Sequence, residues 1–251
     1  MKNKLNHNLQ NKTVWINGGR RIGQTIAQRL AEHGVNIVMS YRSSREEAEK
    51  EIEKVKKLGV KTLMVKCDVS SKESVEEAVK EIKKKFKKVD ILVNMASVFT
   101  PVSFENVNLE DWEKNFSAHM LGTFWPTQVL SKILPKGGHV INIADRTSIG
   151  KVYKGYLPYV VTKSAISAMT KALAVELAPN GIFVNAIAPG PILRPDDISK
   201  KDWQKIRDES PLKFKISDEE AVNQFAELVL YLSSVTMASG YTYPLDQGQN
   251  L

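Results

Sequence analysis

The sequence has very little cysteine. Cys67 is the only cysteine in 251 residues, so the chain cannot form an internal disulfide, and this fits a reducing compartment. No apolar run approaches the roughly 20 residues that a membrane-spanning helix needs. The polar start, MKNKLNHNLQNK, also lacks the apolar core of a signal peptide. We therefore expect a cytoplasmic protein that does not bind membranes, with residues 1–11 as a loose tail.

The chain also lacks the aromatic residues that a nucleic-acid surface interleaves with its basic ones, although its net charge is +8. The lysines gather in residues 50–57 and 80–88, where apolar residues recur at helical spacing. Lysines in that pattern occupy the solvated faces of amphipathic helices. We favour this interpretation over a nucleic-acid patch, so no nucleic-acid partner is expected.

No linker, composition shift or internal repeat divides the sequence, so residues 1–251 are expected to form a single domain. Short β-branched runs alternate with longer amphipathic segments, which predicts an α/β fold. This is a doubly wound parallel sheet of the Rossmann type with helices on both faces. Strands are predicted at Thr13–Asn17, Asn36–Ser40, Lys61–Lys66, Asp90–Val93, His139–Ile143, Phe183–Ile187 and Tyr241–Leu245. Helices are predicted at Ile22–His33, Arg45–Leu58, Lys72–Phe86, Leu109–Ile133, Tyr159–Ala178 and Asp218–Ser233.

Residues 189–217 interrupt this alternation with a polar stretch that contains Pro191, Pro195 and Pro211. A long insertion near the carboxyl edge of such a sheet usually covers a substrate as a loop or helix pair. The alternative is an irregular connection without a functional role.

The junction between the first strand and the first helix is rich in glycine and arginine. A tight glycine turn there exposes backbone N–H groups and a helix N-terminus, which suit a pyrophosphate. The glycine spacing departs from the G-x-G-x-x-G template, and glycine-rich turns also occur without ligands. The residues of this junction that we assign to cofactor binding are Gly18, Arg20, Arg21, Ile22 and Gly23.

The end of the second predicted strand lacks an acidic residue. An NAD site needs Asp or Glu about 20 residues past the turn to bind the ribose hydroxyls. Here Arg42 and Ser43 can instead contact a 2′-phosphate, with Arg20 nearby. Arg42 can also be an ordinary solvated arginine, but after such a turn we expect the cofactor to be NADPH.

Tyr159 and Lys163 are four residues apart, so they share one face of a helix. A buried ammonium beside a phenol stabilises the phenolate and is expected to lower the pKa of Tyr159 from its usual value of about 10. Such a phenol can protonate the atom that becomes anionic as hydride arrives. Asp145 directly follows the apolar run 140–144, which predicts a buried strand. The carboxylate of Asp145 therefore lies at the carboxyl end of a strand, where ligands bind in this fold class.

With these residues assembled, the chain resembles the short-chain dehydrogenase/reductase family over essentially its whole length. The matching pieces occur in the family's order: the glycine-rich turn, Cys67-Asp68-Val69, Asn94-Met95-Ala96-Ser97, the Tyr159/Lys163 pair and Pro189-Gly190.

The resemblance implies a role for each matching piece. Asp68 would lie beside the adenine, Lys163 would hold the nicotinamide ribose, and Ile192 would help to line the carboxamide. It also implies a homotetramer built through the Leu109–Ile133 and Tyr159–Ala178 helices. The cofactor-binding residues that the resemblance adds are Asp68, Val69, Asn94, Ala96, Tyr159, Lys163, Pro189, Gly190 and Ile192.

Four positions depart from the family's usual pattern: Ile16-Asn17 replaces Thr-Gly, Arg21 replaces a glycine, Asp145 replaces a serine, and His119 stands where an asparagine is usual. Arg21 and Asp145 together resemble the pteridine reductase branch, which also has a phenylalanine that sandwiches a pterin against nicotinamide. A carboxylate meets the N–H-rich edge of an aminopteridine better than a hydroxyl does, and an aromatic ring stacks on a flat heterocycle. The substrate-binding residues expected on this basis are Arg21, Ser97, Phe99, Asp145 and Tyr159.

Each of these residues also has a simpler interpretation. Phe99 can pack within its own loop, and Asp145 can cap a turn or pair with Arg146 or Arg21. His119 can be a buried helix histidine bonded to backbone, or it can replace the asparagine of the family's proton relay.

The sequence thus predicts an NADPH-dependent reductase with Asp145, Tyr159 and Lys163 as catalytic residues and no metal. Hydride would pass to a C=N bond of a small dihydropteridine-like substrate. One alternative is a carbonyl reductase that acts on 3-oxoacyl thioesters. Another is a catalytically idle NADP-binding sensor.

Overall fold

The computed structural model of the chain describes residues 9–18, 22–43, 45–195 and 198–251. In this part of the chain the strands form one parallel sheet in the order β3-β2-β1-β4-β5-β6-β7. The strands are β1 (Thr13–Gly18), β2 (Asn36–Tyr41), β3 (Thr62–Lys66), β4 (Ile91–Met95), β5 (His139–Ile143), β6 (Phe183–Pro189) and β7 (Thr242–Leu245).

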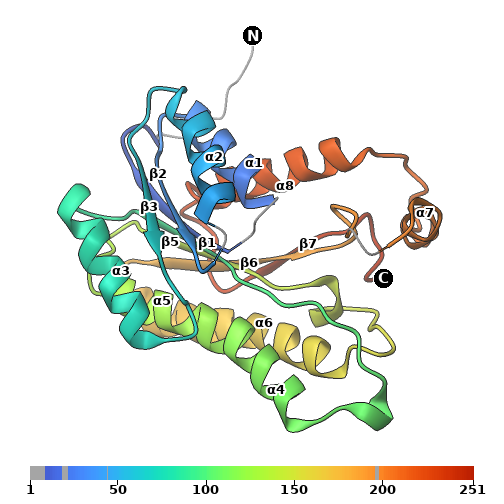
Figure 1. Cartoon of the computed structure of the whole chain (residues 1–251). Coiled ribbons are helices and arrows are strands. Elements are labelled where there is room, and N and C mark those ends of the chain that lie inside the picture. Colours follow the sequence, from blue (N-terminus) through green and yellow to red (C-terminus); the bar gives the residue numbers. More distant parts are fainter. Residues whose placement is uncertain (1–8, 19–21, 44, 196–197) are drawn as a thin grey trace.

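Helices cover both faces of this sheet (Figure 1). Helices α1, α2 and α8 lie on one face, and α3, α4, α5 and α6 lie on the other. The helices are α1 (Ile22–Glu32), α2 (Arg45–Lys56), α3 (Lys72–Lys85), α4 (Leu109–Phe116), α5 (Gly122–Ser131), α6 (Leu157–Leu177), α7 (Lys200–Asp208) and α8 (Asp218–Leu232). Short 3₁₀ turns occur at Phe104–Asn106, Arg146–Ser148 and Ala178–Asn180.

Each strand sends alternate side chains into two separate cores. On β1, Val14 and Ile16 join the core under α1 and α8, whereas Trp15 joins the core under α3 and α5. This alternation follows from the two-residue period of a strand. Because both faces are covered, the central strands send apolar side chains into both cores, and buried asparagines such as Asn17, Asn94 and Asn142 lie toward their carboxyl ends.

The strand order reverses between β1 and β4, which pair with each other at the centre of the sheet. A doubly wound sheet opens a crevice at this point, beyond the carboxyl ends of the strands. The segments that follow β1, β4, β5 and β6 therefore converge on one edge, and they carry most of the predicted site residues.

The predicted fold is confirmed, and every predicted strand is present with ends shifted by no more than two residues. The single long helix predicted at Leu109–Ile133 is wrong. A π-helical turn at Ser117–Leu121 separates α4 from α5, and the buried side chain of His119 lies within this wide turn.

The loose tail predicted at residues 1–11 is also wrong for its last three residues. Leu9 is fully buried, and Asn11 donates its backbone N–H to the Gly34 carbonyl. Because the Leu9 side chain is buried in the core beside the end of α1, this part of the chain is held in place. Within the described residues, no helix has both the length and the apolar character needed to cross a membrane.

Candidate active site

The turn after β1 approaches the end of β4 closely. Gly18 has φ +73°, and a Cβ on it would lie 2.6 Å from the backbone nitrogen of Ala96. Glycine is therefore required here for two reasons: the backbone is left-handed, and there is no space for a side chain. Gly23 is buried at the start of α1, with Ile22 before it. Arg20 and Arg21, which the sequence assigns to this turn, lie outside the described residues.

The ends of β2 and β3 bring opposite charges to the same edge of the sheet. Arg42 and Ser43 are exposed directly after β2. Asp68 follows β3 and accepts hydrogen bonds from the Ser70 hydroxyl at 2.6 Å and the Ser70 N–H at 3.0 Å. Hydrogen bonds from Ser70 lower the pKa of Asp68 despite its partial burial, with a smaller contribution from Arg42. Arg42 and Asp68 therefore both lie at the edge of the sheet where the sequence predicts the adenosine end of the cofactor.

Asn94 lies beneath the site in a buried chain of amide groups. The Asn94 Oδ1 atom accepts from Asn17 Nδ2 at 2.6 Å, and Asn94 Nδ2 donates to Asn142 Oδ1 at 2.9 Å. Asn142 in turn donates to the Thr170 hydroxyl at 2.9 Å. The side chain of Asn94 thus ties β1, β4 and β5 together, and Asn17 is its partner on β1.

Asp145 and Tyr159 meet at the carboxyl end of β5. The Tyr159 hydroxyl donates to Asp145 Oδ2 at 2.7 Å, and Asp145 Oδ1 accepts from the Thr147 N–H at 2.9 Å. Asp145 therefore both caps the short turn that follows it and holds the phenol. Lys163, one turn along α6, is buried and donates to the Ile143 carbonyl at 2.8 Å. The structure thus brings the three predicted catalytic residues together.

The pKa of Tyr159 is raised well above its ordinary value, so the predicted lowering of this pKa is wrong for the protein without ligand. Burial raises the pKa of Tyr159 most. The Asp145 carboxylate raises it further through its charge and by accepting a hydrogen bond from the phenol. The Lys163 ammonium lies 6.0 Å from the centre of the Tyr159 ring and does not offset these effects. Burial also lowers the pKa of Lys163 to about 8. Tyr159 therefore keeps its proton through neutral pH, as a proton donor must.

Phe99 lies against this pair of residues and faces solvent on its other side. Its ring is stacked on Tyr156 with centroids 4.4 Å apart and meets the Tyr159 ring edge-on at 4.8 Å. The side chain is 43% exposed. Phe99 both packs within its own loop and presents an open surface next to the Tyr159 ring.

His119 links the segment after β4 to α6. Its Nε2 accepts the Val98 N–H at 3.2 Å and lies 3.0 Å from the Ser97 hydroxyl. Its Nδ1 lies 2.8 Å from the Thr162 hydroxyl. Because Nε2 accepts the Val98 N–H, the ring is neutral with its proton on Nδ1. Burial, together with the nearby Lys163, lowers the pKa of His119 to about 3. The His119 Nε2 atom thus holds the Ser97–Val98 segment, and its Nδ1 atom holds the ring to α6.

Known proteins share this arrangement of fold and sequence. A family model described as Enoyl-(Acyl carrier protein) reductase matches residues 18–250. The 3-oxoacyl-(acyl-carrier-protein) reductase of Aquifex aeolicus is 34% identical over 233 residues, which cover 90% of this chain and 91% of that protein. The chain belongs to the short-chain dehydrogenase/reductase family. As a member of this family it is an oxidoreductase.

Two solved structures of the family agree with this fold over almost the whole chain. A short-chain dehydrogenase/reductase from Serratia marcescens superposes with a TM-score of 0.89 at 28% identity and covers 98% of this chain and 100% of its own. A short chain dehydrogenase from Burkholderia cenocepacia in complex with NADP has a TM-score of 0.88 at 26% identity, with 97% and 100% covered.

In this short-chain dehydrogenase/reductase, Arg146 is a buried cation next to Asp145. From the sequence it is expected only as a partner of Asp145. Its Nε donates to the Tyr153 hydroxyl at 2.8 Å, and its Nη1 donates to Gln249 Oε1. Gln249 Nε2 donates to the Ile206 carbonyl of α7 at 2.9 Å. Burial, followed by the Asp145 carboxylate, raises the pKa of Tyr153 to about 12. Tyr153, Arg146 and Gln249 therefore connect the Asp145 carboxylate to α7, and only the final packing reveals this connection.

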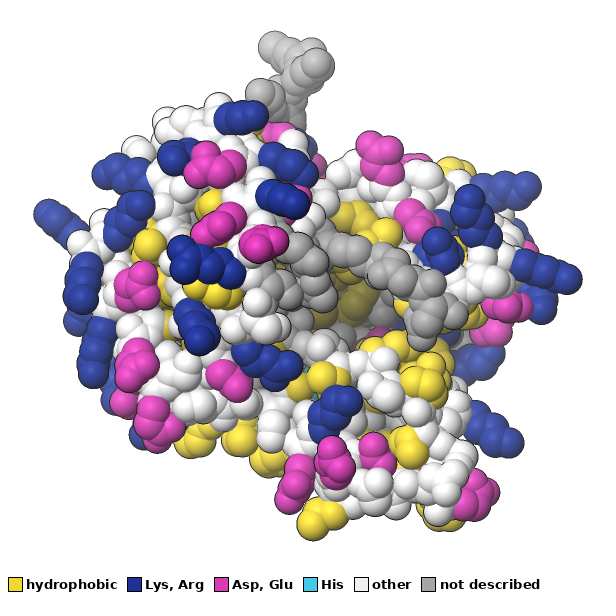
Figure 2. Space-filling view, viewed as in Figure 1, with side chains coloured by type: hydrophobic (Ala, Val, Ile, Leu, Met, Phe, Trp, Pro, Cys, Tyr) yellow, Lys and Arg dark blue, Asp and Glu magenta, His cyan; other side chains and the backbone are white. Residues whose placement is uncertain are grey.

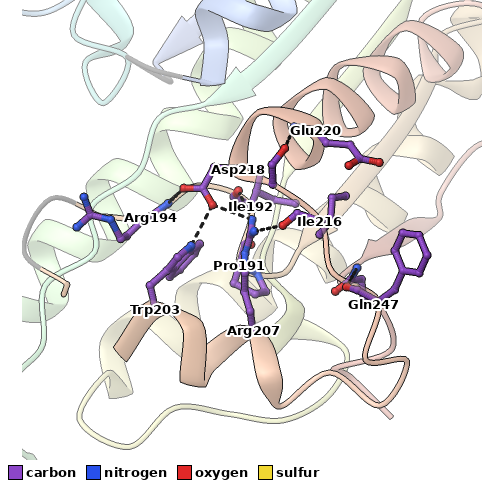
Figure 3. Close-up of polar contacts among 11 residues, drawn as sticks. Pro191, Ile192, Arg194, Trp203, Arg207, Ile216, Asp218, Glu220 and Gln247 are labelled. Atoms are coloured by element: carbon purple, nitrogen blue, oxygen red, sulfur yellow. Dashed lines mark hydrogen bonds and ion pairs between the residues drawn. The ribbon is translucent and has the colours of Figure 1, made fainter. Parts of the chain in front are cut away.

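The 189–217 segment contains α7, and Arg207 on this helix forms polar contacts with the rest of the segment (Figure 3). Arg207 points from α7 toward the backbone of Pro191 and Ile192, directly after β6. The face of the molecule shown in Figure 2 is hollowed beside this segment, and hydrophobic side chains lie in the hollow. A pocket lined by Pro191, Ile192, Ile216 and Leu245 adjoins Arg207.

Proposed function

We propose that this protein is an NADPH-dependent reductase that transfers hydride to a C=N bond of a dihydropteridine or a related pterin. The observation that carries the proposal is the hydrogen bond from Tyr159 to Asp145 beside the exposed ring of Phe99. The phenol of Tyr159, the carboxylate of Asp145 and the flat ring of Phe99 lie next to each other. These are the three features needed to recognise and protonate a flat, N–H-rich heterocycle.

The described residues fit NADPH. Gly18 leaves no room for a side chain beside Ala96, so glycine lets the turn after β1 pack directly against the end of β4. Arg42 and Ser43 follow β2 without an acidic residue, which favours a 2′-phosphate over free ribose hydroxyls. When bound, the cofactor supplies the hydride. The structure from Burkholderia cenocepacia in complex with NADP supports this choice.

The chain's own residues would divide the remaining tasks. Tyr159 donates its proton to the nitrogen that becomes basic as the C=N bond is reduced, and the Asp145 carboxylate accepts N–H groups of the ring edge. Phe99 covers one face of the ring, and Lys163 holds the nicotinamide ribose. Ser97 is fixed by His119 at the same edge, and Arg21 completes the substrate contacts.

A second candidate is reduction of a 3-oxoacyl thioester, with Asp145 in the positioning role of the family's serine. Its support is the 34% identity to the 3-oxoacyl-(acyl-carrier-protein) reductase of Aquifex aeolicus. Tyr159 and Lys163 would serve a ketone as well as a C=N bond, so Asp145 and Phe99 are the residues that favour the pterin.

A homotetramer forms part of the proposal. Five large apolar side chains on α4 and α6 are exposed in the single chain: Leu109, Phe116, Leu157, Val161 and Val175. The two helices pack against each other. Apolar surface at these helices suits contact with a second copy of the chain. A small-molecule substrate and a cytoplasmic location complete the assignment.

The test is NADPH oxidation by the purified protein with dihydrobiopterin, dihydrofolate or an acetoacetyl thioester. We expect turnover on a dihydropterin that is abolished in Asp145→Ala. Turnover on the thioester alone would replace the pterin assignment with carbonyl reduction. Binding of NADPH without turnover on any of the three would refute the assigned reaction.

A further inference from the structure

One guanidinium group joins the two ends of the segment between β6 and α8. Arg207 donates through Nη2 to the carbonyls of Pro191 at 3.2 Å and Ile192 at 3.0 Å, at the start of the segment. Through Nη1 it donates to the carbonyl of Ile216, at the end of the segment. The Arg207 side chain is 11% exposed, so these hydrogen bonds form largely away from water.

The guanidinium is itself held in place from α7 and α8 (Figure 3). Arg207 Nη2 lies 3.1 Å from Asp218 Oδ1 in an ion pair, and the guanidinium lies over the Trp203 ring at 5.3 Å. The Trp203 indole N–H donates to the same Asp218 oxygen at 3.1 Å. Asp218 is in the first turn of α8, where a carboxylate is favoured by the helix dipole. These contacts fix the orientation of the guanidinium and balance its charge.

The segment at residues 190–192 is also held by β7, on the side opposite the Arg207 side chain. The Gly190 N–H donates to the Leu245 carbonyl at 3.0 Å. A Cβ on Gly190 would lie 2.6 Å from the Asp246 side chain, so the two backbones are in close contact. Residues 190–192 are therefore held between β7 and the Arg207 side chain, directly after the carboxyl end of β6.

We propose that Arg207 is a positioning residue for the nicotinamide end of the cofactor. It fixes the carbonyls of Pro191 and Ile192, and so it shapes the segment that receives the carboxamide. The proposal rests on the proposed function only in placing the carboxamide at Pro189–Ile192. A lysine cannot replace Arg207, because an ammonium lacks the planar fork that reaches several carbonyls at once.

Binding measurements without substrate test this role. NADPH spans the whole crevice, whereas adenosine 2′,5′-bisphosphate occupies only the part beside Gly18, Arg42 and Asp68. In Arg207→Lys and Arg207→Met, we expect the Kd of NADPH to rise about tenfold, as loss of one or two charged hydrogen bonds would produce. The Kd of adenosine 2′,5′-bisphosphate should stay within about twofold of the wild-type value.

Arg194→Met is the matched control. Arg194 lies in the same segment, but its side chain donates to the carbonyls of Pro195 and Ile198. We expect this variant to bind NADPH as the wild type does. An unchanged Kd of NADPH in Arg207→Lys would overturn the proposal. So would equal weakening of NADPH and adenosine 2′,5′-bisphosphate, or equal effects of Arg194→Met and Arg207→Met. None of these outcomes depends on turnover of a pterin.

Discussion

The Tyr159 hydroxyl donates a 2.7 Å hydrogen bond to the carboxylate of Asp145, at the point where β5 meets α6. A carboxylate in this position can only accept, so it orients the phenol proton and holds the phenol in its neutral form. A serine hydroxyl at the same position would not impose this charge. Asp145 therefore keeps the phenol protonated, and under the proposed function its carboxylate also meets the N–H edge of the substrate.

Tyr159→Phe should abolish turnover while leaving the cofactor site intact. The change removes the donated proton and keeps the ring that packs against Phe99 and His119. We expect kcat to fall by about a thousandfold, within the range that general acid catalysis contributes. The variant should still bind NADPH, as followed by the fluorescence of the cofactor. A variant with undiminished turnover would exclude Tyr159 as the acid.

Phe99→Ala should weaken substrate binding more than it slows chemistry. The exposed Phe99 ring offers a stacking surface, and one aromatic contact contributes about 0.5–1.5 kcal/mol beyond its buried area. We expect KM for a dihydropterin to rise up to about tenfold, with a smaller change in kcat. Phe99→Tyr is the control, because it keeps the ring. An unchanged KM in Phe99→Ala would mean that the ring serves only the packing of its own loop.

His119 should make the protein less stable in acid. Its pKa falls from 6.5 to about 3 on folding, so the unfolded chain binds a proton between these values and the native protein does not. Stability is therefore greatest above pH 6.5 and decreases as the pH falls toward 3. Between pH 7 and pH 5 this single group should account for a loss of about 2 kcal/mol.

Urea unfolding at these two pH values checks this expectation in the wild type and in His119→Gln. Glutamine can accept the Val98 N–H but does not titrate. The wild type should lose about 2 kcal/mol more than the variant between pH 7 and pH 5. Equal losses would show that His119 is protonated in the folded protein.

The fold could be predicted from the sequence because its signals are local. The apolar run 140–144 predicts a buried strand, and Asp145 lies at its carboxyl end. The spacing of Tyr159 and Lys163 also places them on one helix face. The π-helical turn at Ser117–Leu121 depends instead on the bonds of His119 to Val98 and Thr162, which are distant in sequence. A helical pattern alone does not reveal such contacts.

Contacts between residues distant in sequence also limit what could be predicted about the site. The spacing of Tyr159 and Lys163 predicts their common face but not their charges, because the pKa of Tyr159 depends on burial and on Asp145. Arg207 acts through carbonyls that any sequence would supply, so nothing at positions 191, 192 or 216 signals the contact. These interactions arise only from the final packing.

The most direct measurement of the central claim is the ratio of kcat/KM for a dihydropterin to that for an acetoacetyl thioester, in the wild type and in Asp145→Ser. We predict that the wild type prefers the pterin and that the serine variant loses this preference by about a hundredfold or more, as expected when a charged hydrogen-bond partner is removed. Thioester reduction should survive, because Tyr159 and Lys163 remain. A ratio that is the same in both proteins, or a wild type that prefers the thioester, would contradict the assignment of Asp145 to pterin recognition.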